Sequence, residues 1–285
     1  MIAQNFDYSA PASLNEALAL LAGDDVKVLA GGMSLIPLMK LRLATPGQLV
    51  DIGRIPGLNY IREDKGVVRI GATTTHYDVE SSGVVRSRCP LLAEAASFIG
   101  DIQVRNRGTI GGSIAHADPA ADYPASLLAL EARAVLASAR KQREIALSDF
   151  FVDTFTTALE PGEIISEVIV PVEEQSVGTS YQKMIQPASG FAIVGVAARV
   201  KKSGGKVTMA RVGVTGLAGK PYRATNVEKA LEGTAGAATD VQKAAAVVAD
   251  GVDANSDLHA SANYRKHLAR IYTMRALAAA LSRTA

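Results

Sequence analysis

The chain has 285 residues, of which 48% are hydrophobic and 20% charged, and its formal net charge is +2. This length is ample for a packed core and suits two domains better than one. A balanced charge without a basic cluster argues against a nucleic-acid surface. No apolar run reaches the roughly 20 residues of a membrane helix, and the first residues lack the pattern of a signal peptide. We therefore expect a cytoplasmic protein without a membrane span.

The single cysteine limits the redox chemistry of this chain. Cys89 has no second cysteine to pair with, and the four histidines lack metal-site spacing. An iron–sulfur cluster needs four thiolates, so the chain cannot hold one with cysteines alone. Any redox chemistry here would need an organic cofactor, and we expect no metal site.

The N-terminal segment has the pattern of a small α/β unit. Ser13 and Glu16 form a capping box at the start of a helix that closes at Gly23. After it we expect a strand over 26–30, a glycine loop, a helix from Pro37 to about residue 43, and a strand over 48–52. This β–loop–α–β order is typical of α/β folds.

Mixed elements follow from residue 60 onward. We expect strands at 61 and 67–70, a helix capped by Thr75, a buried helix over 91–99, a helix capped by Asp122, and strands over 134–137 and 163–171. Residues 173–176 are the best candidate for a linker.

The last third predicts an antiparallel sheet followed by helices. Strands are expected over 180–185, 192–200 and 207–215, with a hairpin turn at 201–205. Helices are expected from Thr225, from Thr239 and over 261–282. In the last of these, basic residues such as Arg265 are interpreted as a solvated face.

Two stretches share an unusual composition, Ala30-Gly31-Gly32-Met33-Ser34 and Thr109-Ile110-Gly111-Gly112-Ser113. Glycine permits positive φ and a close approach to the main chain, and successive exposed N–H groups can bind an anion such as a diphosphate. Neither stretch contains the dinucleotide or ATPase fingerprint. From spacing alone, tight turns explain the glycine pairs equally well.

The residue identities carry a more specific signal, because the two stretches occur in order with further segments of a known family. These segments are Lys40–Arg42, Val50–Ile52, Ile70–Thr73, Gln103–Arg107 and Ala117–Asp122. Over nearly its whole length the chain resembles the FAD-binding medium subunit of the molybdenum hydroxylases. The resemblance implies an α+β fold. Two α/β subdomains of the PCMH or vanillyl-alcohol-oxidase type (1–55 and 56–174) would bind FAD, and a C-terminal domain of antiparallel sheet and helices (178–285) would follow.

The resemblance also implies a set of cofactor-binding residues. Main-chain N–H groups of Gly31, Gly32, Met33 and Ser34 would hold the diphosphate from one side, and Thr109, Gly111, Gly112 and Ser113 from the other. Asp122 would bind a sugar hydroxyl, Lys183 would lie near the flavin, and Ile165 would pack on a ring of FAD. The remaining members of the expected site are Leu29, Ala30, Leu35, Ile110, His116 and Asp118.

Several side chains keep two interpretations. Arg105 and Arg107 could neutralise phosphate or hold the loop to nearby carbonyls, and Phe191 could shield the flavin or belong to the core. His116 fits a cofactor-covering role better than acid–base chemistry. Family members often carry His or Gln where this chain has Met33, so a side-chain hydrogen bond is lost there. We assign no catalytic side chain, because the cofactor supplies the chemistry.

The function implied is that of a subunit in a three-part enzyme. Substrate would be oxidised at a molybdenum–pterin centre in a large subunit, and electrons would pass through two [2Fe–2S] clusters of a small subunit to FAD and an external acceptor. The complex is expected to be a dimer of heterotrimers. One alternative is a free-standing FAD oxidase or dehydrogenase, which needs its own substrate pocket. Another is a non-catalytic nucleotide-binding scaffold, which would carry no flavin.

Overall fold

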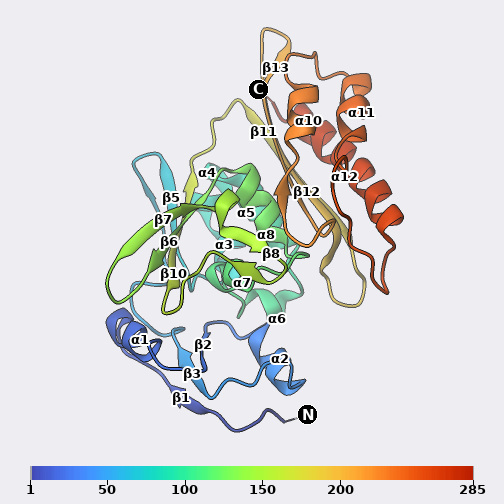
Figure 1. Cartoon of the computed structure of the whole chain (residues 1–285). Coiled ribbons are helices and arrows are strands. Elements are labelled where there is room, and N and C mark those ends of the chain that lie inside the picture. Colours follow the sequence, from blue (N-terminus) through green and yellow to red (C-terminus); the bar gives the residue numbers. More distant parts are fainter. Residues whose placement is uncertain (1, 285) are drawn as a thin grey trace.

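The computed structural model describes residues 2–284, so Met1 and Ala285, the outer ends of the first and last expected domains, lie outside it. Parallel strands, antiparallel sheets and helices occur together, which confirms the α+β class. Figure 1 shows a small lobe at the N-terminal end, a central region, and a C-terminal sheet covered by helices.

The small lobe, residues 2–52, is called the N-terminal lobe here. Its three strands are parallel, in the order β1-β3-β2. Ser13 caps the first helix by accepting from Glu16 N at 3.2 Å, as the sequence predicts. The sheet packs on Ala17 to form a core with Val50 and Ile52. The elements are β1 (Asp7–Ser9), α1 (Leu14–Leu20), β2 (Val26–Leu29), α2 (Leu35–Lys40) and β3 (Gln48–Asp51).

The central region is built on a five-stranded antiparallel sheet in the order β4-β5-β10-β6-β7. These strands are β4 (Ile61–Asp64), β5 (Val67–Gly71), β6 (Arg133–Ala137), β7 (Gln142–Ala146) and β10 (Ile164–Pro171), with a small pair β8 (Phe151–Asp153) and β9 (Thr156–Thr157) beside them. The helices are α3 (His76–Ser81), α4 (Gly83–Arg88), α5 (Pro90–Ser97), α6 (Ile102–Arg105), α7 (Ile110–His116), α8 (Asp122–Ala129) and α9 (Leu147–Phe150). Every residue of α8 is buried, so this apolar helix lies at the centre of the molecule.

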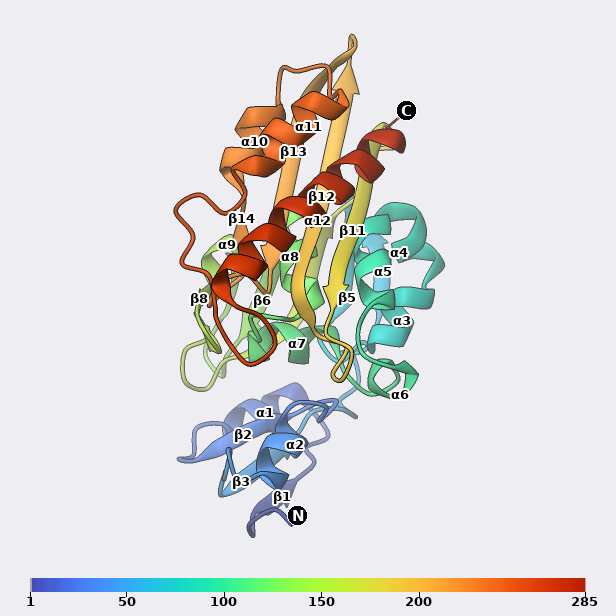
Figure 2. The same cartoon turned by 90° about the vertical axis from the view of Figure 1, so that its right-hand side faces the viewer.

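The C-terminal domain is a four-stranded antiparallel sheet with three helices on its outer face (Figure 2). Its elements are β11 (Val177–Ile185), β12 (Ala192–Ser203), β13 (Lys206–Thr215), β14 (Tyr222–Arg223), α10 (Thr225–Leu231), α11 (Ala238–Ala246) and α12 (Ala262–Ser282). The other face packs on α8 and α5. Gly213 is required there, because a Cβ at this position would overlap the carbonyl of Ala125 in α8. Helix α8 is therefore the common core of the central region and the C-terminal domain.

One basic residue of α12 is not solvated as expected. Arg265 is 5% exposed and donates to the carbonyls of Ile193 and Gly216 at 2.5 and 2.8 Å, and to Asp257 at 2.6 Å. The sequence interpretation was wrong because helical spacing does not reveal unpaired carbonyls on a neighbouring sheet. Its guanidinium thus connects α12 to the first residues of β12 through hydrogen bonds.

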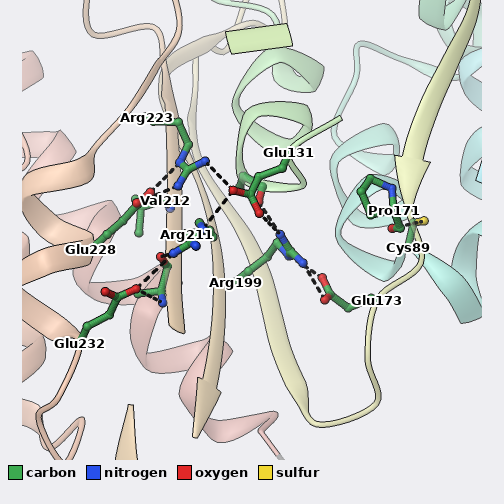
Figure 3. A network of polar contacts seen from close by, with 12 residues as sticks. Cys89, Glu131, Pro171, Glu173, Arg199, Arg211, Val212, Arg223, Glu228 and Glu232 are labelled. Carbon is green, nitrogen blue, oxygen red and sulfur yellow. Dashed lines mark hydrogen bonds and ion pairs between the residues drawn. The ribbon is translucent and has the colours of Figure 1, made fainter. Parts of the chain in front are cut away.

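The expected linker at 173–176 begins with a buried ion pair. Arg199 in β12 donates two hydrogen bonds to Glu173, at 2.6 and 2.8 Å, and one to the carbonyl of Ala129 at 2.8 Å. Figure 3 shows the same arginine next to Glu131, which also receives Arg211 and Arg223 from the C-terminal sheet. The junction between the two domains is thus held by charge-assisted hydrogen bonds.

Removing one partner of this pair tests its contribution. Arg199→Met leaves the carboxylate of Glu173, whose side chain is 4% exposed, without a cation, so we expect the free energy of unfolding in urea to fall by about 3 kcal/mol. The double variant Glu173→Leu/Arg199→Met should regain much of the loss. The control is Lys201→Met on the same strand, whose pair with Glu174 is more exposed and is worth under about 1 kcal/mol. Equal losses in the two single variants would contradict this assignment.

Candidate functional site

A cavity of about 990 Å³ lies between the N-terminal lobe and the central region and is lined by both glycine stretches. Its size is at the large end of the range for ligand pockets. Most of the residues expected to bind a cofactor line it, namely Leu29, Ala30, Gly31, Gly32, Met33, Ser34, Leu35, Thr109, Gly111, Gly112, Ser113, His116, Asp118, Asp122 and Ile165. Ile110 and Lys183 do not. Ile110 is fully buried in the core, and Lys183 lies behind Asp122.

The first glycine stretch connects β2 to α2 as a loop, as expected. Gly32 has a φ of +75°. A Cβ on Gly31 would overlap the carbonyl oxygen of Arg107, so the first stretch touches the main chain directly before the second stretch. Within residues 2–284, the backbone N–H groups of Gly31, Gly32, Met33 and Ser34 have no hydrogen-bond partner. Four donors at a cavity wall suit an anion.

The second stretch differs from the expected loop, because it forms the first turn of α7. Thr109 caps this helix and accepts from the N–H of Gly112 at 3.1 Å. The N–H groups of Ile110, Gly111 and Ser113 donate to main-chain carbonyls. Gly111 permits α7 to pack on Ala72. This side of the cavity therefore offers the hydroxyls of Thr109 and Ser113 and the start of a helix, while its amides are already paired.

A neighbouring segment fixes the second stretch in place. Ile110 N donates to Thr74 O at 3.0 Å, and His76 N donates to Gly108 O at 2.9 Å. The imidazole of His76 also lines the cavity and packs edge-on against Tyr123, with ring centroids 5.2 Å apart. Burial, with a smaller contribution from Arg105, lowers the pKa of His76 to about 4, so the ring is neutral at pH 7. No sequence motif includes His76, since the capping signal is carried by its neighbour Thr75.

Asp122 lines the cavity but is not the helix cap that the sequence predicts. The cap position belongs to Ala121, and Asp122 is the first residue of α8. Its carboxylate accepts from Tyr181 Oη at 2.6 Å and from Lys183 Nζ at 2.9 Å, and both donors come from β11. Burial raises the pKa of Asp122 to about 6 against the opposite pull of these two donors.

Lys183 forms an ion pair with this carboxylate and is not part of the cavity lining. Its side chain is fully buried, and Nζ also donates to the carbonyl of Phe98 at 2.9 Å. Through Lys183 and Tyr181 the C-terminal domain fixes a carboxylate in the cavity wall.

The structure places three of the residues that had two interpretations, Arg105, Phe191 and His116. Arg105 pairs with Glu80 at 2.8 Å and donates to the carbonyls of Ile99 and Gly100, which favours its role in holding the loop. Phe191 is 41% exposed and lines the cavity, outside the core. His116 packs on Phe155 with ring centroids 5.1 Å apart, and burial lowers its pKa.

Within residues 2–284, neither a metal-binding cluster nor an arginine is found in the cavity lining. Among the described residues, no group of three or more His, Cys, Asp and Glu side chains is arranged to hold a metal ion. Across residues 2–284, Lys27 is the one lysine or arginine in the cavity lining. An anion here would be bound mainly by amides, hydroxyls and helix N-termini. None of the helices described combines the length and apolar character needed to cross a bilayer.

Comparison with known proteins identifies two matching family models. The FAD binding domain in molybdopterin dehydrogenase matches residues 4–173, and the CO dehydrogenase flavoprotein C-terminal domain matches residues 179–280. The medium chain of carbon monoxide dehydrogenase from Hydrogenophaga pseudoflava is 43% identical and covers 100% of each chain. The glyceraldehyde dehydrogenase medium chain of Sulfolobus acidocaldarius is 39% identical over 97% of this chain and 98% of its own.

Solved structures agree with these sequence matches. A carbon monoxide dehydrogenase from Hydrogenophaga pseudoflava that lacks the Mo-pyranopterin moiety superimposes with a TM-score of 0.97 at 44% identity over 100% of each chain. Quinoline 2-oxidoreductase from Pseudomonas putida 86 superimposes with a TM-score of 0.94 at 32% identity over 99% of each chain. The resemblance drawn from the sequence motifs is therefore confirmed.

The close approach at Gly31 can be tested by adding one carbon atom. Gly31→Ala places a Cβ against Arg107 O and should force the two stretches apart, so we expect at least a tenfold loss of flavin affinity, about 1.4 kcal/mol. The measurement is flavin released per folded chain. Gly83→Ala is the matched control, because a Cβ there meets open space. Unchanged flavin content in Gly31→Ala would refute the role given to this contact.

The neutral state of His76 predicts a pH dependence of stability. The folded-state pKa of about 4 lies below the ordinary value of 6.5, so the unfolded chain binds this proton first as the pH falls. Stability should therefore drop between about pH 6.5 and 4, by at most about 1.4 kcal/mol per pH unit. Urea unfolding of His76→Phe should lack this component of the slope, whereas His267→Asn, at an exposed position, should keep it.

Proposed function

This chain belongs to the family of FAD-binding subunits of the molybdenum hydroxylases, and from that membership and its cavity we propose that it carries electrons from iron–sulfur clusters of a partner subunit to an external acceptor. It is an oxidoreductase subunit, and FAD is its cofactor. The observation that supports the proposal best is that the four residues with partnerless amides line the cavity between the lobe and the central region. FAD, when bound, supplies the chemistry by accepting and releasing electrons.

The chain's own residues position and shield the cofactor. The N–H groups of residues 31–34 would bind the diphosphate, with the hydroxyls of Thr109 and Ser113 donating from the other side. The carboxylate of Asp122 would accept from a sugar hydroxyl, and Ile165 would pack on a ring. Lys183 would act on the cofactor through Asp122. Acid–base catalysis by a side chain is not part of the proposal.

The partners follow from the architecture of the relatives. Similar proteins are named as medium chains or subunits of larger enzymes, including a nicotine 6-hydroxylase medium subunit from Paenarthrobacter nicotinovorans. We propose a large molybdenum subunit and a small subunit with two [2Fe–2S] clusters, assembled as a dimer of heterotrimers in the cytoplasm. Substrate choice would belong to the large subunit, since the similar proteins bear the names of different substrates.

The free-standing oxidase is the weaker alternative. This chain and the carbon monoxide dehydrogenase medium chain cover 100% of each other, which favours the subunit. The cavity between the lobe and the central region is also the one that the cofactor itself would fill.

Electron transfer through the flavin can be measured in the purified complex without knowing its substrate. After stoichiometric reduction with dithionite, a quinone should reoxidise the iron–sulfur clusters at least tenfold more slowly when FAD has been stripped, and added FAD should restore the rate. Ferricyanide, which can oxidise clusters directly, serves as the control acceptor. The proposal fails if the stripped complex passes electrons to quinone as fast as the loaded one.

A further inference from the structure

The N-terminal lobe is joined to the rest of the molecule by few contacts. Within the described part of the chain, no hydrogen bond or ion pair connects residues 2–52 to residues 60–284, here called the body. Each has its own sheet and its own core. Figures 1 and 2 show the lobe at one end of the molecule, below the body in both views.

What holds the lobe in place is a small apolar contact. Leu18 of α1 is 5% exposed and packs with Ala137 and Ile164 of the central sheet. Three partly buried residues of the lobe, Leu14, Leu21 and Val28, pack against this cluster. The second contact is the close main-chain approach of Gly31 to Arg107. Interfaces that are neither large nor strongly apolar permit relative motion of the parts they join.

The connecting segment, residues 53–59, has the form of a hinge. Its first half belongs to the lobe, because Ile55 is part of the lobe's core. Its second half touches both parts, because the side chain of Leu58 also belongs to the lobe's core while Leu58 O accepts from Thr73 N at 2.9 Å. The body begins with Tyr60, whose N–H donates to Thr74 Oγ1 at 3.2 Å. Pro56 and Gly57 lie within this segment, and Gly57 has a φ of +83° and would meet open space with an added Cβ.

The polar groups that could connect the two parts belong to residues that line the cavity between them. The lobe contributes the partnerless N–H groups of residues 31–34, and the body contributes the hydroxyls of Thr109 and Ser113. The diphosphate of a dinucleotide carries several negatively charged oxygen atoms, so it can accept hydrogen bonds from the lobe and from the body at the same time. It would provide the direct polar link that the two parts otherwise lack.

We propose that the N-terminal lobe is a clamp that turns about the connecting segment 53–59, opens when the cavity is empty, and is closed by the dinucleotide held between lobe and body. The identity of the ligand rests on the proposed function, but the hinge does not. A ligand that binds only the closed arrangement shifts the population toward it. Loading of the cofactor and ordering of the lobe are then the same event.

Distances between two spin labels test the clamp directly. The full chain carries one label in the lobe and one in the body, through Lys40→Cys and Lys243→Cys, both exposed positions. Cys89 is buried, so it should not react. Without FAD we expect a broad distance distribution, and with saturating FAD a narrow one. The control pair Lys141→Cys/Lys243→Cys lies within the body and should give a narrow distribution in both states.

Weakening the apolar contact should shift the same readout. Leu18→Ser should broaden the FAD-free distribution further and raise the rate of FAD release severalfold, whereas Ala19→Ser, at an exposed position on the same helix, should change neither. A flavin-free distribution as narrow as the control pair overturns the clamp, whether or not FAD binds. Failure of FAD to bind at all, seen in the visible spectrum, would instead count against the proposed function and leave a broad flavin-free distribution as support for the hinge.

Discussion

The architecture depends on one close contact between main chains. At Gly31 the N-terminal lobe meets the carbonyl of Arg107 with no room for a side chain between them. This contact brings the loop after β2 opposite the start of α7 and creates the cavity along the seam. Since the amides on the lobe side remain without partners, the seam is also where an anion gains most from binding.

The two walls of the cavity perform different tasks. The loop of the lobe keeps its donors available, whereas the amides of the second stretch are used to fix α7 on the body. The carboxylate of Asp122 in the cavity wall is also fixed in position, because it accepts hydrogen bonds from Tyr181 and Lys183 of β11. The C-terminal domain thus contributes to the cavity through the start of α8, without lining most of it. A rigid body combined with a lobe that makes few contacts with it would let a prosthetic group enter the cavity and then remain bound there.

Much of this could be predicted from the sequence, and the remainder depended on contacts between distant segments. Short-range signals gave the N-cap at Ser13, the hairpin between β12 and β13, and the antiparallel strands of the C-terminal domain. The side chain of Glu16 accepts from Ala12 N instead of closing a capping box with Ser13 N, and the turn is shorter than the expected 201–205 because β12 runs to Ser203. The residue order of the two glycine stretches was specific enough to indicate the family. The sequence could not show that Thr109 caps a helix whose first N–H groups are already hydrogen-bonded within the chain. It also could not show that Lys183 forms an ion pair with Asp122, or that Arg265 is buried. Each of these depends on which carbonyl or carboxylate a neighbouring element presents, and chain spacing does not encode that.

The central claim is that the free amides of residues 31–34 bind the cofactor's diphosphate. Amide hydrogen exchange on the flavin-loaded and flavin-stripped protein tests it residue by residue. We expect exchange at Gly31, Gly32, Met33 and Ser34 to slow by at least tenfold when FAD is bound, while the amides of residues 110–113, already paired, change little. Equal exchange at residues 31–34 in both states, with FAD demonstrably bound, would contradict the account.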